Sequence, residues 1–193
     1  MEKLPVRQYA LLALILLNGI WIHAQQKPSG EVRNIVTINP NSGYVTINEL
    51  NYGFGLGSRD LPYSGYYYGI TSMHGYQLNR YGLHIDHSIQ AGIATGFLVY
   101  NEGNLIPLYL DMRYNINHNT LSPFVMGNGG LLISYSDFDQ GTRIFIKGGG
   151  GLRYWIDERF QATLGAALQV QMGNGSPRDA FVTINAGIIY KPR

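Results

Sequence analysis

The sequence predicts an all-β protein, an eight-stranded antiparallel up-and-down transmembrane β-barrel. The first observation is a strict two-residue alternation, in segments of about ten residues separated by turn signals. Its clearest example places one set of apolar residues on one strand face: Phe160, Ala162, Leu164, Ala166, Leu168 and Val170. Polar or small residues occupy the other face: Gln161, Thr163, Gly165, Ala167, Gln169 and Gln171. Successive strand side chains point to opposite faces, so one face meets lipid and the other a polar interior.

A soluble sandwich or ligand-binding barrel would reverse this arrangement. Its inward face is the apolar one and is packed with large branched or aromatic side chains. Here the face that is not apolar carries Gln, Thr and Gly. The pattern therefore favours a membrane-spanning barrel.

The second observation is an N-terminus typical of secretion. Lys3 and Arg7 precede a mainly apolar run from Tyr9 to Ile22, and a small residue, Ala24, stands before a plausible cleavage point. We expect residues 1–24 to be a signal peptide, 25–43 a flexible tail and 44–193 the barrel. The alternative, a retained anchor helix, is disfavoured because the run is shorter than the roughly 20 residues that a span needs.

Composition is the third observation. The chain has 193 residues, 15 Tyr, 25 Gly, no Cys and a formal net charge of +2. Tyr suits a membrane interface, and Gly suits tightly curved strands. Without Cys there is no disulfide framework and no thiolate metal site. A charge this close to zero predicts no nucleic-acid partner.

The alternation and the turn signals divide residues 46–190 into eight segments. These are 46–57, 66–79, 84–100, 104–116, 122–136, 142–156, 159–172 and 180–190. An even number returns both ends of a barrel to the same side, and eight strands make a small barrel. No segment keeps an apolar helical period long enough to predict a helix.

Several of these segments resemble a known family. They are Tyr76-Gln77-Leu78-Asn79, the strand from Ile106 to Tyr114, Ser122-Pro123-Phe124-Val125 and the run from Gly149 to Tyr154. Over about residues 44–190 the chain is similar to the small outer-membrane-protein β-barrel domain common in Bacteroidetes. The resemblance implies location in the bacterial outer membrane, contact with outer-membrane lipid, and handling by the barrel-assembly machinery during biogenesis. Such barrels usually end on an aromatic residue, whereas here Lys191-Pro192-Arg193 follow Tyr190.

Two residue groups have the types needed for chemistry. His84, Asp86 and His87 include metal-ligand types, but in a strand His87 points away from the other two, so the set is incomplete. Ser72, His74 and Glu49 supply the residue types of a hydrolase triad, but Ser72 and His74 fall on the lipid-facing side. We therefore expect no enzyme activity, no catalytic residues, no metal and no cofactor.

Inward-facing charges are the more informative group. Their residues are Glu49, Asp86, Asp111, Arg113, Lys147 and Arg153. An unpaired ion inside a closed barrel costs several kcal/mol, so we expect these groups to neutralise one another. Asp111 and Arg113 lie two apart on one strand face, with Arg153 and Glu49 at similar depth. We expect these carboxylates and guanidinium groups to hydrogen-bond across the barrel. A structural plug is favoured over a proton or ion relay, because side chains normally fill an eight-stranded lumen.

Three function classes remain. The leading one is a monomeric barrel with a structural or interaction role; the others are a narrow, porin-like channel or small-ligand binder, and a lipid-modifying enzyme. If an outer loop binds a ligand, the candidates are four tyrosines: Tyr63, Tyr66, Tyr67 and Tyr68. An aromatic girdle at the membrane interface is the alternative role for them.

Overall fold

The computed structural model describes residues 43–192 apart from 58–62, 64, 81–85, 102, 118–119, 135–141 and 174–177. The expected signal peptide and all but the last residue of the expected tail lie outside the described residues. Among the described residues, no helix is long and apolar enough to cross a membrane.

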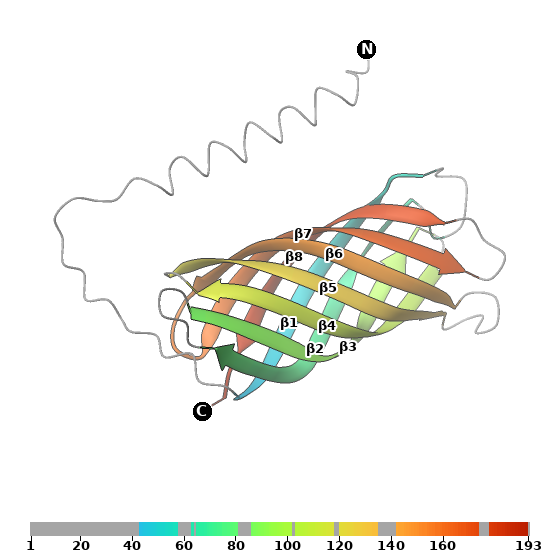
Figure 1. The fold of residues 1–193 in the computed structure, drawn as a ribbon. Helices are drawn as coiled ribbons and strands as arrows, with labels where there is room; N and C mark the ends of the chain where they lie inside the picture. Colours follow the sequence, from blue (N-terminus) through green and yellow to red (C-terminus); the bar gives the residue numbers. More distant parts are fainter. Residues whose placement is uncertain are drawn as a thin grey trace, which may run out of the picture. The chain divides into compact units, whose positions relative to one another are not determined.

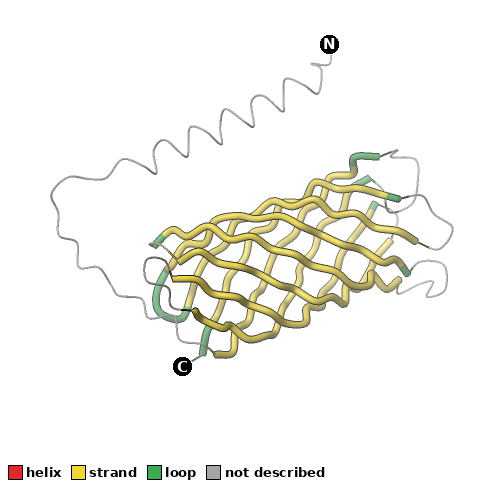
Figure 2. The backbone as a smooth tube through the Cα atoms, viewed as in Figure 1, coloured by secondary structure: helices red, strands yellow, loops and turns green. Residues whose placement is uncertain are grey.

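Eight strands form a closed barrel in chain order (Figures 1 and 2). They are β1 (Gly43–Gly55), β2 (Tyr66–Arg80), β3 (Asp86–Tyr100), β4 (Gly103–Asn117), β5 (Leu121–Ser134), β6 (Arg143–Trp155), β7 (Phe160–Gly173) and β8 (Asp179–Tyr190). Every neighbouring pair is antiparallel, and β8 closes the barrel by pairing with β1, with Thr46 opposite Tyr190. The predicted fold class is confirmed. We call the end where β1 begins and β8 ends the terminus end.

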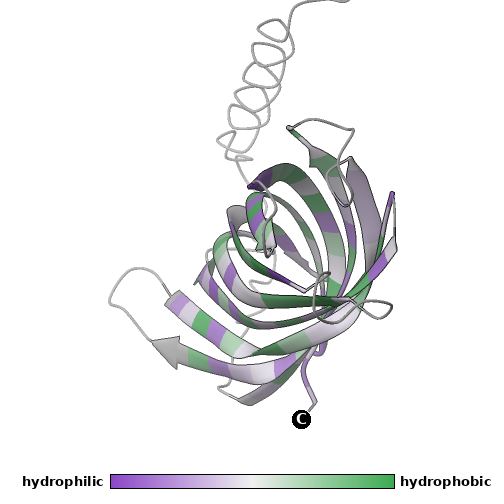
Figure 3. Cartoon of the chain, turned by 90° about the vertical axis from the view of Figure 1, so that its right-hand side faces the viewer, coloured by the Kyte–Doolittle hydropathy of each residue, from purple (hydrophilic) through white to green (hydrophobic). Residues whose placement is uncertain are grey.

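Burial alternates along the strands as the sequence pattern predicts. In β1, Glu49 and Asn51 are buried, whereas Leu50 between them is 64% exposed. The outward positions of all eight strands carry exposed apolar side chains, and Figure 3 shows the resulting alternation of hydrophobic and hydrophilic bands. The surface of the barrel is therefore more apolar than its interior, opposite to a soluble fold.

The inward face is not polar throughout, which corrects the expectation of a polar interior. Towards the end opposite the termini, apolar and aromatic side chains fill the barrel: Tyr67, Leu98, Tyr100, Leu105, Tyr109, Leu132, Phe145 and Phe181. Val45 and Ile47 are also buried and inward in β1. Alternation fixes which residues face outward, but an inward residue only needs to fit its neighbours, and an aromatic ring fills a narrow barrel well.

Glycine lets β6 and β7 approach closely. A Cβ atom at Gly149 would lie 2.2 Å from the Ala166 carbonyl oxygen, and one at Gly151 would lie 2.2 Å from that of Leu164. Any larger residue would push the two strands apart. Gly149 and Gly151 in β6 are therefore required by strand packing.

Exposed aromatic side chains gather at both ends of the outer surface. Near the terminus end they are Tyr44, Tyr76, Tyr114, Tyr154 and Phe160, and near the opposite end Tyr52, Phe54, Tyr66 and Tyr68. Two aromatic girdles enclosing an apolar band are typical of a barrel that crosses a bilayer.

Candidate functional site

The centre of the lumen holds a buried ionic cluster around Arg113. Its guanidinium donates two hydrogen bonds of 2.9 Å to the Asp111 carboxylate, which lies on the same face of β4. A third bond of 2.9 Å crosses the barrel to Glu49 on β1. All three side chains are at most 4% exposed. Bidentate pairing of this kind fixes both the geometry and the charge state.

Two amides complete the bonding of the carboxylates. Asn128 on β5 donates to Asp111 over 2.6 Å, and Asn185 on β8 donates to Glu49 over 3.1 Å. The cluster therefore joins β1, β4, β5 and β8 across the interior. Groups bonded on several sides stabilise a fixed arrangement and offer no ready acid or base for proton transfer.

The other charges predicted for this cluster lie around it. Lys147 is buried, with its Nζ atom 5.9 Å from the centre of the Tyr109 ring. Arg153 lies over the Trp155 ring at 5.2 Å, near the terminus end. The hydrogen bonds that the structure shows from an arginine to Asp111 and Glu49 come from Arg113, and the expected bonds of Arg153 to these carboxylates stay a prediction. The side chain of Asp86 lies outside the described residues.

Towards the opposite end, tyrosine and glutamine side chains bond one another inside the barrel. Tyr67 donates to Gln169 over 2.8 Å, and Tyr100 donates to Gln171 over 3.1 Å. A neighbouring cavity, lined among others by Tyr67 and Lys147, has a volume of about 10 Å³. That is room for about one water molecule.

These contacts correct part of the predicted tyrosine surface. Tyr67 is buried in the lumen and is not available to an external ligand. Tyr66 and Tyr68 face outward and are 45% and 50% exposed. Tyr63 is partly buried, packs edge-on against Tyr100, and adopts a left-handed backbone φ of 63°. The outward pair fits the girdle role better than a loop site for ligands.

One ion pair was missed by the sequence reasoning. Arg143, the first residue of β6, donates to Asp179, the first residue of β8, over 2.8 Å. The Arg143 guanidinium also lies 5.0 Å from the centre of the Tyr63 ring. Both charges are inward residues at strand starts, and this shared position is the signal that could have identified the pair.

The candidate catalytic residues do not assemble as a triad. On the outer face, the Ser72 hydroxyl lies 3.3 Å from Nε2 of His74, whose Nδ1 atom bonds the Tyr44 hydroxyl. Glu49 lies inside the barrel with Arg113. His87 bonds Tyr114 over 2.7 Å, and no set of His and acidic residues suited to a metal occurs within the described residues.

Comparisons with known proteins support the fold. No family model matches the chain, and no curated protein matches it in sequence. The crystal structure of Neisserial surface protein A superposes with a TM-score of 0.54 at 10% identity, covering 79% of this chain and 99% of that chain. The translocator domain of the autotransporter NalP from Neisseria meningitidis matches with a TM-score of 0.33 at 8% identity, covering 95% of this chain and 96% of that chain. Ail, the attachment invasion locus protein of Yersinia pestis, matches with a TM-score of 0.25 at 12% identity, covering 77% of this chain and 96% of that chain. The chain thus has the fold of small outer-membrane barrels, while membership of the Bacteroidetes family stays a prediction.

Proposed function

We propose that this protein is a small integral barrel of the bacterial outer membrane with a structural or interaction role, whose lumen is closed by its own side chains. The observation that carries the proposal is the inversion of burial. Exposed apolar residues form the outer band between two aromatic girdles, and ionic groups are buried inside. Such an apolar outer surface is favourable only when it is surrounded by lipid.

The closed lumen follows from two layers of contacts. The Arg113 cluster ties strands together across the centre, and the Tyr67 and Tyr100 hydrogen bonds fill the half beyond it. Solutes would have to break these bonds to pass. The lumen thus acts as a core, and any interaction is left to the outer surface and loops.

A narrow hydrated path is the second candidate. Several buried polar atoms near the centre and terminus end have no hydrogen-bond partner within the described residues, among them Oγ1 of Thr163 and both amide atoms of Gln161. Buried polar groups normally bond protein or ordered water, so these atoms favour some hydration. The lipid-modifying enzyme is less supported, because Glu49 lies on the opposite side of the sheet from Ser72.

Membrane insertion is tested with charge substitutions at two depths. Leu164 lies in the middle of the outer band, where an arginine costs about 2–4 kcal/mol, whereas Leu78 lies beyond the girdle residue Tyr76, where the cost is about 0–1 kcal/mol. Leu164→Arg should therefore lower the free energy of unfolding in lipid vesicles far more than Leu78→Arg. The wild-type protein should also sediment with the outer-membrane fraction. Equal stability of the two variants, or recovery in a soluble fraction, would refute the proposal.

A further inference from the structure

The polar residues of the outer band are concentrated on three adjacent strands. Between the girdles, the outward positions of β4 to β8 carry apolar side chains or glycine within the described residues. Those of β1 to β3 include Thr46, Asn48, Ser72, His74 and Thr95. We call these five residues the polar face.

The centre of the polar face lies deep in the band. Asn48 stands directly opposite Ser72 on β2, which stands directly opposite Thr95 on β3. Ser72 is midway along its strand between the girdle residues Tyr68 and Tyr76. Given the proposed function, on which this inference rests, these three side chains face the hydrocarbon interior and not the headgroups.

Two of these side chains lack hydrogen bonds in a single barrel. Ser72 and Tyr44 both bond His74. By contrast, the amide of Asn48 and the hydroxyl of Thr95 make no side-chain hydrogen bond to the rest of the described chain, and both are exposed. Acyl chains offer no donors or acceptors, so such groups are costly unless another molecule bonds them.

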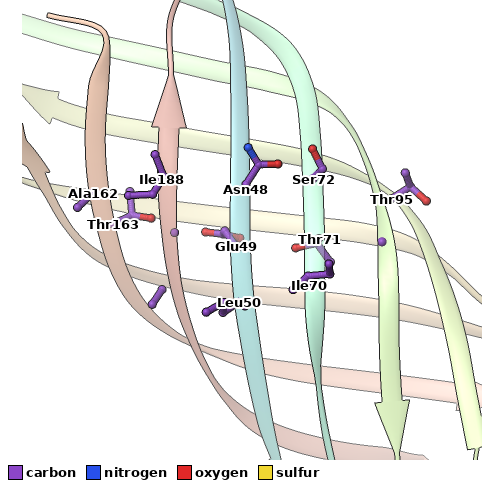
Figure 4. Close-up of a pocket in the computed structure, with 13 residues that line it drawn as sticks. Asn48, Glu49, Leu50, Ile70, Thr71, Ser72, Thr95, Ala162, Thr163 and Ile188 are labelled. Carbon is purple, nitrogen blue, oxygen red and sulfur yellow. The ribbon is translucent and has the colours of Figure 1, made fainter. Parts of the chain in front are cut away.

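The barrel surface is hollowed at this face (Figure 4). The hollow has a volume of about 610 Å³ and is lined by residues of β7, β8, β1, β2 and β3, with none from the other strands. Asn48, Ser72 and Thr95 line it together with Leu50, Ile70 and Ile188. Ala162 and Ala186 contribute small side chains to it. Small residues beside hydrogen-bonding ones are typical of contacts between helices within membranes.

We propose that the polar face is the surface through which two copies of this barrel associate in the membrane. A twofold axis along the membrane normal keeps each residue of the polar face at the same depth as its counterpart, because both copies are inserted identically. An Asn amide and the Ser and Thr hydroxyls each donate and accept, so the polar face is complementary to itself without any charge. A lipid headgroup cannot satisfy these groups, because it stays at the level of the girdles. This proposal differs from the monomer that the sequence leads one to expect.

Disulfide trapping tests the geometry, since the chain has no native cysteine. Ile70→Cys places a thiol in the hollow, and Ile146→Cys places one on the outer face of β6 as a matched control. After oxidation of the full barrel in lipid vesicles, Ile70→Cys should give cross-linked dimers and Ile146→Cys should not. Cross-linking at both positions alike, or at neither, would overturn the proposal.

A second pair of variants tests the polar contacts themselves. Asn48→Leu combined with Thr95→Val makes the outer band more apolar, so these variants should still fold in lipid. Association, measured by energy transfer between labelled barrels, should weaken by about tenfold or more, while the control Asn104→Leu on β4 leaves it unchanged. The dimer would be refuted if the double variant associated as strongly as the wild type. It would also be refuted if the wild type were monomeric and bound a lipid that the double variant did not bind. A barrel that inserts but stays monomeric refutes this inference alone, whereas failure to insert refutes the proposed function.

Discussion

At the scale of single residues, Arg113 is the side chain on which the interior most depends. It carries the hydrogen bonds of two buried carboxylates, Asp111 and Glu49. Arg113→Met should therefore lower the free energy of unfolding by about 3–5 kcal/mol, since it leaves two uncompensated charges in a buried site.

The matched control for Arg113 removes the stranded charges as well. Adding Asp111→Asn and Glu49→Gln to Arg113→Met should recover part of the loss, as measured by urea unfolding in lipid vesicles. If all these variants match the wild type, the cluster must be screened by bulk water, and the closed lumen is wrong.

Lys191, just beyond the end of β8, makes the stability of the folded protein depend on pH. Its Nζ atom lies over the Trp155 ring at 5.4 Å, and burial, together with the nearby Arg153 charge, lowers the pKa of Lys191 to about 7. Between that value and its ordinary pKa of 10.5, the unfolded chain binds a proton that the folded chain does not, so stability rises with pH across this window.

Replacing Lys191 isolates this contribution. In Lys191→Met, the free energy of unfolding should lack the part of its rise with pH that is due to this residue. The difference in this free energy between wild type and variant should therefore vary with pH from about pH 7 upward. A difference that is flat from pH 7 to 10 would mean that the amine is solvated.

The inward charges illustrate what the sequence can and cannot predict about the site. Alternation identifies Glu49, Asp111, Arg113, Lys147 and Arg153 as inward, and the described structure buries them all. Which cation meets which carboxylate depends on strand register and stagger around the barrel, which one sequence does not specify. This is why alternation alone does not identify the Arg143–Asp179 pair.

At the scale of elements, β6 shows how neighbouring glycines differ. Gly149 faces its neighbour β7 so closely that a Cβ atom would lie 2.2 Å from a carbonyl oxygen, whereas a Cβ atom at Gly148 meets nothing within 4 Å. Gly149→Ala should therefore cost about 1–3 kcal/mol through strand displacement. Gly148→Ala should be neutral or slightly stabilising, because it reduces the freedom of the unfolded chain. Similar stability of the two variants in vesicles would contradict the close strand approach.

The strands themselves were largely predictable. Alternation located all eight, and their outward faces agree with the exposed residues of the structure. The ends differ by a few residues, as at Gly43, where β1 begins before the predicted segment. Strand ends leave the lipid, so the constraint that produces the alternation weakens there. Inward apolar residues such as Phe145 and Phe181 were not predicted as a core, because inward positions need only fit a narrow space.

At the scale of the whole molecule, two surfaces have different roles in this account. The interior contains the ionic cluster and a layer of aromatic side chains. The outer surface carries the lipid band and, on β1 to β3, the polar face. Interaction is thus expected at the membrane-facing surface and not through the lumen.

Planar-bilayer recording of the purified, folded protein tests most directly whether this barrel inserts in a membrane without conducting ions. Because buried bonds of Arg113, Tyr67 and Tyr100 cross the lumen, insertion should produce no stepwise current under moderate voltage. Tyr67→Gly together with Tyr100→Gly removes two rings of the aromatic layer. This double variant should carry a larger leakage current than the wild type, which would show that the barrel inserts. Steady unitary conductance of the wild-type protein would contradict the account and identify the barrel as a channel.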